Sequence, residues 1–318
     1  MLKSSLNSIN FGSKIVSQSN LSQNRQSHLK PETSADTFTS TQNTISTPTF
    51  KGLLGINKQD KDGLTVLMQA VTIGNKEIVE QLIAGVDLNI QDKNGSTALM
   101  IAAAKGNNEI VDQLIKAKAD LNIQDKGGDT ALLAAAAKGN NKIVEKLIKA
   151  KADLNIENNF GDTALIWAVL GGNNETVDQL IKAKADLNIQ DKGGYTALLA
   201  AASNYNDEMV EQLIKAKADL NIEDKNGRTA LMHAGACGYD KIVEQLIEAG
   251  ADLNIQDKDG NTALIFAGAR GHNKIVEQLI KAKADLNIQS KNGSTALMLA
   301  DENGQNEIAD KLRKAGAK

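Results

Sequence analysis

The sequence predicts an all-α solenoid, built from stacked turn–helix–helix units and preceded by a polar tail. Two observations predict it. A short motif, T-x-L, recurs at a nearly fixed interval along most of the 318 residues, and each interval holds two short apolar segments separated by turn residues. Self-similarity at a fixed period of about 20–50 residues is typical of repeat architectures.

The threonine of this motif marks each repeat. The first step between successive threonines is 32 residues and every later step is 33. The motif threonines are Thr65, Thr97, Thr130, Thr163, Thr196, Thr229, Thr262 and Thr295. The eight predicted repeats are 60–91, 92–124, 125–157, 158–190, 191–223, 224–256, 257–289 and 290–318. They are numbered one to eight below, and positions are counted from the first residue of each.

Repeat two illustrates how one unit is expected to fold. Gly95 supplies a positive φ for a tight turn, and the hydroxyl of Thr97 caps the first helix, ALMIAAAK. Gly106 ends that helix in the left-handed conformation. The segment NNEIVDQLIKA then places its apolar residues on one face at helical spacing, and ADLNIQ runs extended into the next turn.

The period of 33 residues, the G-x-T-A-L start and the order turn, helix, helix resemble the ankyrin repeat. The resemblance covers residues 60–318. The family's T-P-L-H-x-A reads TALMIA, TALLAA, TALIWA, TALLAA, TALMHA, TALIFA and TALMLA, with alanine replacing proline throughout. The resemblance implies an ankyrin-repeat solenoid that binds a protein partner on its concave face and turn tips.

Lysine replaces the family's usual glycine after the second helix in five repeats. These lysines are Lys118, Lys151, Lys184, Lys217 and Lys283, whereas repeat six keeps Gly250. A left-handed lysine costs about 1–2 kcal/mol. Either the helix therefore ends differently in these repeats, or attraction between lysine and the helix dipole offsets part of that energy.

Residues 1–49 differ in composition from the repeats. More than half are Ser, Thr, Asn or Gln, and both prolines of the chain lie here. Such a segment buries too little apolar surface to fold, so we expect a disordered tail, or else a targeting or secretion signal of another kind. It lacks the apolar region of a secretory signal peptide. Residues 50–59 are expected to form a degenerate N-terminal cap.

Residues suited to catalysis or metal binding are scarce. One cysteine and three histidines offer no metal-ligand spacing, and no phosphate-binding loop or nucleophile motif is present. Residues 60–318 carry 30 Lys and Arg against 37 Asp and Glu, which opposes binding to nucleic acid. No apolar run is long enough to span a membrane. We therefore expect a monomer without catalytic residues, cofactor or metal, not an enzyme, with no nucleic-acid or membrane partner.

Partner-binding residues are predicted where the repeats depart from their own consensus. In the ankyrin family, partners contact the turn tips (positions 2, 3 and 5) and the exposed end of the first helix (positions 13 and 14). Departures at or beside these positions gather in repeats four to seven, and Tyr and Arg among them are typical of binding hot spots. The predicted residues are Phe160, Asp162, Leu170, Tyr195, Asn204, Tyr205, Arg228, Cys237, Asn261 and Arg270. The alternative is neutral drift on a tolerant surface.

Three residues at position 10, Trp167, His233 and Phe266, are expected to pack between repeats. The predicted function is a scaffold or regulator that binds another protein, in the cytoplasm. The alternative is an effector secreted by an intracellular bacterium into a host cytosol, because the Lys-, Asn- and Ile-rich repeats are similar in style to ankyrin proteins of such bacteria.

Overall fold

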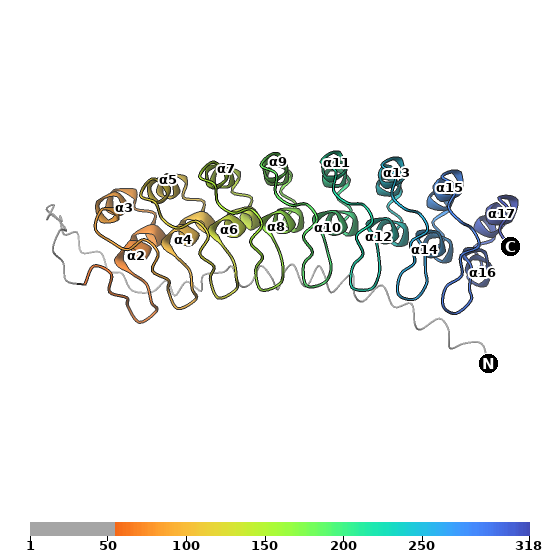
Figure 1. Ribbon diagram of the computed structural model, residues 1–318, viewed down its shortest axis with the longest axis horizontal. Coiled ribbons are helices and arrows are strands. Elements are labelled where there is room, and N and C mark those ends of the chain that lie inside the picture. The colour runs from red at the N-terminus through yellow and green to blue at the C-terminus, as the bar shows by residue number, and fades with distance from the viewer. Residues whose placement is uncertain (1–54) are drawn as a thin grey trace. The chain divides into compact units, whose positions relative to one another are not determined.

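The computed structural model describes residues 55–318, and the predicted tail (1–49) and half of the predicted N-terminal cap (50–59) lie outside them. The described chain comprises an N-terminal block, residues 55–159, and a C-terminal block, residues 160–318. Every regular element in this part of the chain is an α-helix (Figure 1). None of these helices is both long and apolar enough to cross a membrane.

Helices occur in pairs in both blocks, one short inner helix followed by one outer helix. The N-terminal block contains α2 (Val66–Ile73), α3 (Lys76–Ile83), α4 (Ala98–Lys105), α5 (Asn108–Lys116), α6 (Ala131–Lys138) and α7 (Asn141–Lys149). The C-terminal block contains α8 (Ala164–Leu170), α9 (Asn174–Lys182), α10 (Ala197–Ser203), α11 (Asp207–Lys215), α12 (Ala230–Cys237), α13 (Asp240–Glu248), α14 (Ala263–Arg270), α15 (Asn273–Lys281), α16 (Ala296–Glu302) and α17 (Asn306–Lys314).

The inner helices begin and end as the sequence predicts. The hydroxyl of Thr97 accepts a hydrogen bond from the backbone amide of Met100 at 3.3 Å, which caps the start of α4. Gly106 ends α4 with φ 77°, in the left-handed region. Each motif threonine from Thr65 to Thr295 caps its inner helix in the same way.

The core lies between neighbouring helix pairs, because the inner helices are apolar on nearly all sides. In α12 every residue before Cys237 is buried, whereas outer helix α13 buries only Ile242, Val243 and Leu246. Small residues let the inner helices approach closely. A Cβ atom added to Gly235 would lie 3.3 Å from the carbonyl oxygen of Ala263 on α14. Alanine and glycine therefore set the spacing between repeats.

Hydrogen bonds between repeats fix their register. Gln91 donates from Nε2 both to the carbonyl of Gly95 (2.6 Å) and to that of Gln124 in the next repeat (2.9 Å). Asn89 accepts through Oδ1 from the backbone amide of Asp120, also one repeat further on. Because both bonds satisfy backbone groups that the loops leave open, they join repeats at a defined offset.

All five lysines that replace glycine after the outer helices are left-handed, with φ between 65° and 69°. The first alternative, a differently ended helix, is therefore wrong. The amides of Lys118 and Ala119 donate to the carbonyls of Ile115 and Leu114, so α5 closes with the bonds of a Schellman motif. Gly250 and Gly316 hold the same position in repeats six and eight, with φ 87° and 97°.

Replacing one of these lysines by glycine should stabilise the chain. Lys118→Gly removes about 1–2 kcal/mol of left-handed strain and adds about 0.5–1 kcal/mol of backbone entropy to the unfolded state, so we expect a net gain of about 0.5–1 kcal/mol. The matched control is Lys116→Gly, inside α5, which should lose up to about 1 kcal/mol. Thermal melts monitored by circular dichroism would test both variants. Equal changes in melting temperature, of the same sign, would contradict the claim that the backbone of Lys118 is strained.

Candidate protein-binding surface

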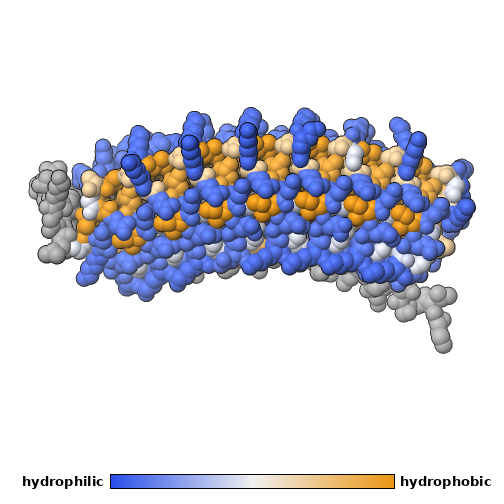
Figure 2. Space-filling model, viewed as in Figure 1, coloured by the Kyte–Doolittle hydropathy of each residue, from blue (hydrophilic) through white to orange (hydrophobic). Residues whose placement is uncertain are grey.

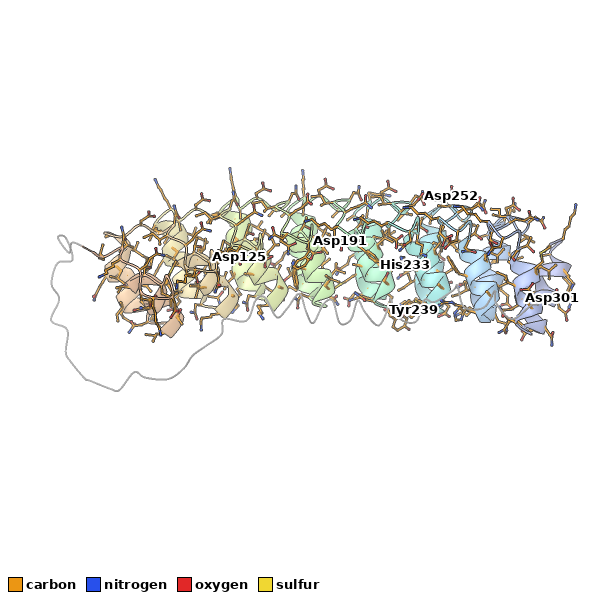
Figure 3. The ribbon with its side chains drawn as sticks, turned by 90° about the horizontal axis from the view of Figure 1, so that it is seen from below. Asp125, Asp191, His233, Tyr239, Asp252 and Asp301 are labelled. Carbon is orange, nitrogen blue, oxygen red and sulfur yellow. The ribbon has the colours of Figure 1, made fainter. Side chains whose placement is uncertain are left out.

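The predicted partner-binding residues all lie in the C-terminal block, but the structure does not unite them. Several fall into two clusters, at opposite ends of the inner helices. The turn cluster consists of Tyr195, Asp224, Arg228, His233, Asp257 and Phe266. The helix-end cluster consists of Tyr205, Cys237, Tyr239, Arg270 and His272. His233 lies in the middle of α12 and Tyr239 lies two residues beyond its C-terminal end; both are labelled in Figure 3.

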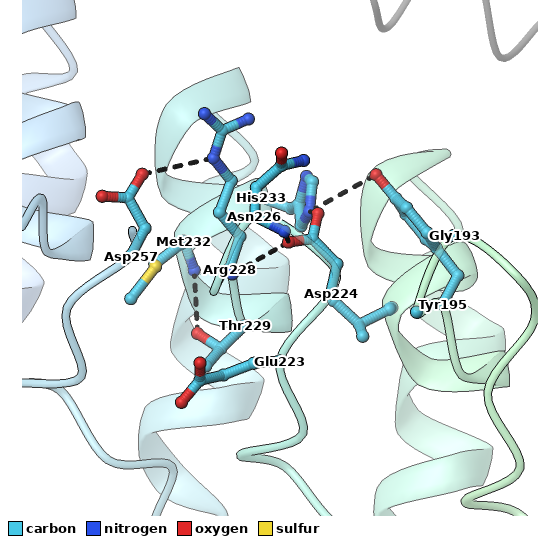
Figure 4. Close-up of polar contacts among 12 residues, drawn as sticks. Gly193, Tyr195, Glu223, Asp224, Asn226, Arg228, Thr229, Met232, His233 and Asp257 are labelled. Carbon is cyan, nitrogen blue, oxygen red and sulfur yellow. Dashed lines mark hydrogen bonds and ion pairs between the residues drawn. The ribbon is translucent and has the colours of Figure 1, made fainter. Parts of the chain in front are cut away.

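A buried aspartate organises the turn cluster (Figure 4). Oδ1 of Asp224 accepts from the backbone amides of Asn226 (2.7 Å) and Arg228 (2.9 Å), which closes the turn. Oδ2 lies 3.1 Å from Nε2 of His233, and both side chains are almost fully buried. The hydroxyl of Tyr195, from the preceding repeat, lies 3.5 Å from the same nitrogen. The imidazole therefore links two successive repeats.

Arg228 makes the corresponding link to the next repeat. Its Nε donates to Oδ2 of Asp257 at 3.3 Å, and its guanidinium lies 5.7 Å from the ring centre of Phe266. The arginine side chain is only 16% exposed and the aspartate 1%. A charge-assisted hydrogen bond and a cation–π contact thus join positions 5, 1 and 10 of neighbouring repeats.

These contacts change how the departures from consensus are interpreted. Tyr195 and Arg228 were expected to contact a partner at exposed turn tips, yet both are half-buried and packed against the following repeat. Two of the unusual residues at position 5, Tyr195 and Arg228, face unusual residues at position 10 of the next repeat, His233 and Phe266 respectively. Sequence reasoning considered the two positions separately, although their paired departures within one chain were a usable signal.

The electrostatics of the turn depend on the histidine. Burial by itself would raise the pKa of Asp224, but hydrogen bonds from His233 and from backbone amides outweigh it, so the pKa lies below the usual 3.8. Asp125 closes the equivalent turn of repeat three and has no histidine bond. There, burial outweighs the backbone hydrogen bonds and raises the pKa.

The helix-end cluster presents an exposed aromatic pair. Tyr205 is 58% exposed, and its ring centre lies 4.7 Å from that of Tyr239 at a tilt of 42°. Tyr205 has φ 57°, at position 15, where the other seven repeats have glycine. A left-handed tyrosine costs about 1–2 kcal/mol relative to the right-handed backbone. Tyr239 is not among the residues that the sequence predicts for partner binding.

Cys237 and Arg270 lie beside this pair. Burial raises the pKa of the Cys237 thiol, opposed by the nearby Arg270 charge and by a hydrogen bond with Tyr239. Nη1 of Arg270 donates to the carbonyl of Ala236 at 2.7 Å, and Nε2 of His272 lies 3.2 Å from the same oxygen. These two side chains from repeat seven satisfy a carbonyl at the end of α12. Arg270 thus also joins repeats.

The other predicted residues make no side-chain contact that joins the two clusters, although Asn204 directly precedes Tyr205 and the backbone amide of Asn261 donates to Asp257. Phe160, Leu170 and Asn261 are half-buried, and Asn204 is exposed at the end of α10. Asp162 is fully buried, so the expectation that it lies at an exposed turn tip is wrong. The position-10 residues Trp167 and Phe266 are buried as expected, and His233 is buried too.

Among residues 55–318 no group of three or more His, Cys, Asp or Glu side chains could hold a metal ion.

A family model described as ankyrin repeats (3 copies) matches the chain at residues 40–125, 100–191, 170–257 and 238–318. The chain belongs to the ankyrin-repeat family. The comparison with curated proteins gives no match. Ankyrin repeats are generally protein–protein interaction modules, and ankyrin-repeat proteins are typically scaffolds rather than enzymes.

The link between ankyrin repeats six and seven can be tested with Arg228→Ala. Removing the guanidinium leaves the buried carboxylate of Asp257 without its charged donor, so we expect a loss of about 1–3 kcal/mol in unfolding free energy. Asn261→Ala changes the same position in the next repeat and should stay within about 0.5 kcal/mol of the parent. Urea unfolding measures both, and equal stability of the two variants would contradict the contact.

His233→Leu tests the electrostatic role of the histidine, since leucine stands at this position in repeat eight. The lowered pKa of Asp224 means that its ionised form stabilises the fold above pH 3.8, and that this contribution disappears as the pH falls through the lower, folded-state pKa. The variant should therefore be less stable than the parent near neutral pH, and the difference should shrink below pH 3.8. A difference in unfolding free energy that does not vary with pH would contradict the assignment.

Proposed function

We propose that this ankyrin-repeat chain is a protein-interaction scaffold or regulator, and that its partner binds along the turn tips and inner-helix ends of repeats four to seven. The observation that carries the proposal is Tyr205. An exposed tyrosine occupies a left-handed position that the other seven repeats give to glycine. Strained residues persist where a function or the surrounding packing holds them.

The surroundings of Tyr205 support a binding role. Its ring leans on Tyr239 and still leaves most of its surface to solvent. Tyrosine supplies a large, rigid contact area with few rotatable bonds, and it is enriched in binding hot spots. The exposed aromatic pair is therefore the proposed anchor for the partner, and Arg228 and Tyr195 hold the turns at the other end of the inner helices in place.

Tyr205→Gly separates binding from folding. Glycine removes the strain of the left-handed backbone but also removes the contact with Tyr239, worth about 0.5–1.5 kcal/mol, so stability should change by less than about 1 kcal/mol. Loss of a hot-spot side chain should weaken partner binding about tenfold or more. The full chain is first immobilised and used as bait in extracts of its native cells. Titration of the parent and the variant with the retained protein then gives the two affinities.

Lys217→Gly is the matched control. It replaces another residue of repeat five with a left-handed backbone, at the opposite end of α11 from Tyr205. It should leave partner affinity unchanged. Unchanged affinity of Tyr205→Gly, or the same loss in both variants, would remove Tyr205 as the anchor. Failure of the parent chain to retain any specific protein would remove the proposed function itself.

A further inference from the structure

An asparagine followed directly by glycine occurs four times in the chain, at Asn94, Asn226, Asn292 and Asn303. This pair is chemically labile, because glycine has no Cβ atom to shield its backbone nitrogen from the carbonyl of the asparagine side chain. The nitrogen reaches that carbonyl only after the backbone of the asparagine has rotated. The packing around each pair therefore decides which asparagine reacts.

Two of the four asparagines have nearly the same neighbours in sequence. Asn94 and Asn292 both stand at position 3 of their repeats, in the segment K-N-G-S-T-A-L-M. The turns differ at position 1, where repeat two has Asp92 and repeat eight has Ser290. A difference in reactivity must then come from position 1 and from the packing of the folded chain.

The pair in repeat two is held from both sides. Oδ1 of Asp92 accepts from the backbone amides of Asn94 and Ser96, both at 2.8 Å. The carbonyl of Asn94 accepts from the amide of Lys126 in the next repeat at 2.9 Å. Gly95 is buried beneath the same repeat, since an added Cβ atom would lie 2.7 Å from the nitrogen of Lys126. Rotation of this backbone breaks hydrogen bonds on both sides of it.

The pair in repeat six is held in the same way (Figure 4). Oδ1 of Asp224 accepts from the amide of Asn226 at 2.7 Å, and the amide of Lys258 in the next repeat donates to the carbonyl of Asn226 at 2.8 Å. Gly227 is buried, and a Cβ atom there would lie 2.9 Å from the nitrogen of Lys258. Two repeats thus protect their Asn-Gly pair by the same contacts.

The first pair of repeat eight lacks these contacts. Oγ of Ser290 accepts from the amide of Ser294 at 3.2 Å, but within residues 55–318 the amide of Asn292 donates no hydrogen bond. Gly293 is exposed, and beyond its chain neighbours no atom of the described residues lies within 4 Å of an added Cβ. One bond, from the amide of Gly293 to the carbonyl of Ser290 at 2.8 Å, still closes this turn. The edge that the turns of the C-terminal block form, lowest in Figure 2, is largely hydrophilic and open to water.

The second pair of repeat eight is exposed but restrained. Nδ2 of Asn303 donates to the carbonyl of Ala269 in the preceding repeat at 3.0 Å. The backbone amide of Asn303 donates to the carbonyl of Leu299 at 3.1 Å, at the end of α16. Its side chain and its backbone are therefore both held, whereas those of Asn292 are not.

We propose that Asn292 is a site of spontaneous deamidation, with water as the co-reactant. The nitrogen of Gly293 forms a bond to Cγ of Asn292, and the side-chain nitrogen leaves as ammonia with the proton of the glycine amide. Water then opens the succinimide ring at either carbonyl, which leaves aspartate or isoaspartate. Both products add a negative charge to the turn, and isoaspartate also lengthens its backbone by a methylene group. This chemistry is independent of the proposed function.

One sample of the full chain gives the rates at all four asparagines. The chain is incubated at mildly alkaline pH in water enriched in heavy oxygen, which labels each new carboxyl group, and is then mapped by peptide mass spectrometry. Asn292 should convert about tenfold or more faster than Asn94 and Asn226, because fewer hydrogen bonds must open there. Asn303 should lie in between. Fastest conversion at any other asparagine, or equal rates at Asn292 and Asn94, would overturn the proposal.

The unfolded chain provides the control for local sequence. In concentrated urea Asn94 and Asn292 should convert at the same rate within about twofold, because the packing that separates them is gone. A difference that persists in urea at its full size would overturn the proposal, since it would then come from the sequence around each asparagine and not from the fold.

Exchanging the residues at position 1 tests the cause. Ser290→Asp supplies the carboxylate that closes the other turns and should slow conversion of Asn292 about threefold or more. The matched exchange, Asp92→Ser, should speed conversion of Asn94, although the bond from Lys126 keeps it slower than Asn292 in the parent chain. An unchanged rate at Asn292 in Ser290→Asp would overturn the proposal that the open turn makes this residue reactive.

Discussion

No helix pair of this chain can bury its own apolar surface, and the rest of the structure follows from that constraint. A unit of about 33 residues falls below the size at which a chain folds alone without additional support. The inner helices are therefore apolar on nearly all sides, and each is covered by its neighbours. Stability becomes a sum of contacts between adjacent repeats, which places unusual importance on the residues that meet there.

The aspartate at position 1 serves both its own turn and the contact between neighbouring repeats. The carboxylate closes its own turn through backbone amides and, with its second oxygen, receives a side chain from the same or the preceding repeat. His233 and Arg228 fill that role in different ways, and each comes with an aromatic neighbour. The carboxylates at position 1 are buried in this way, and their hydrogen bonds hold neighbouring repeats together.

The regular part of this fold was predictable from the sequence because its signals are local. Threonine caps, terminating glycines and apolar spacing act within a few residues, and the structure has them at the expected places. The backbone of Lys118 was not decided by such signals, since lysine disfavours the left-handed region that the surrounding helix end requires. The closing hydrogen bonds outweigh the preference of one residue.

The candidate surface was less predictable, because exposure depends on neighbours that are distant in sequence. Arg228 and Tyr195 looked like free contacts until Phe266 and His233 were placed against them. Asp162 looked exposed from its position but is covered. Tyr205 was identifiable from sequence alone as a departure from glycine, whereas its stacking on Tyr239 needed the packing of two repeats.

The hydrogen bond that the backbone amide of Asp120 donates to Asn89 has a consequence for how such a chain can evolve. The same hydrogen bond recurs between Asp252 and Asn221 and between Asp285 and Asn254, always from an aspartate amide to an asparagine side chain of the preceding repeat. A repeat gained or lost through unequal recombination meets the same joint at both ends, so the array can change length without new chemistry. Repeats five to seven are different, since exchanging one would separate Tyr195 from His233 or Arg228 from Phe266. The chain thus combines interchangeable modules with a segment whose order is fixed.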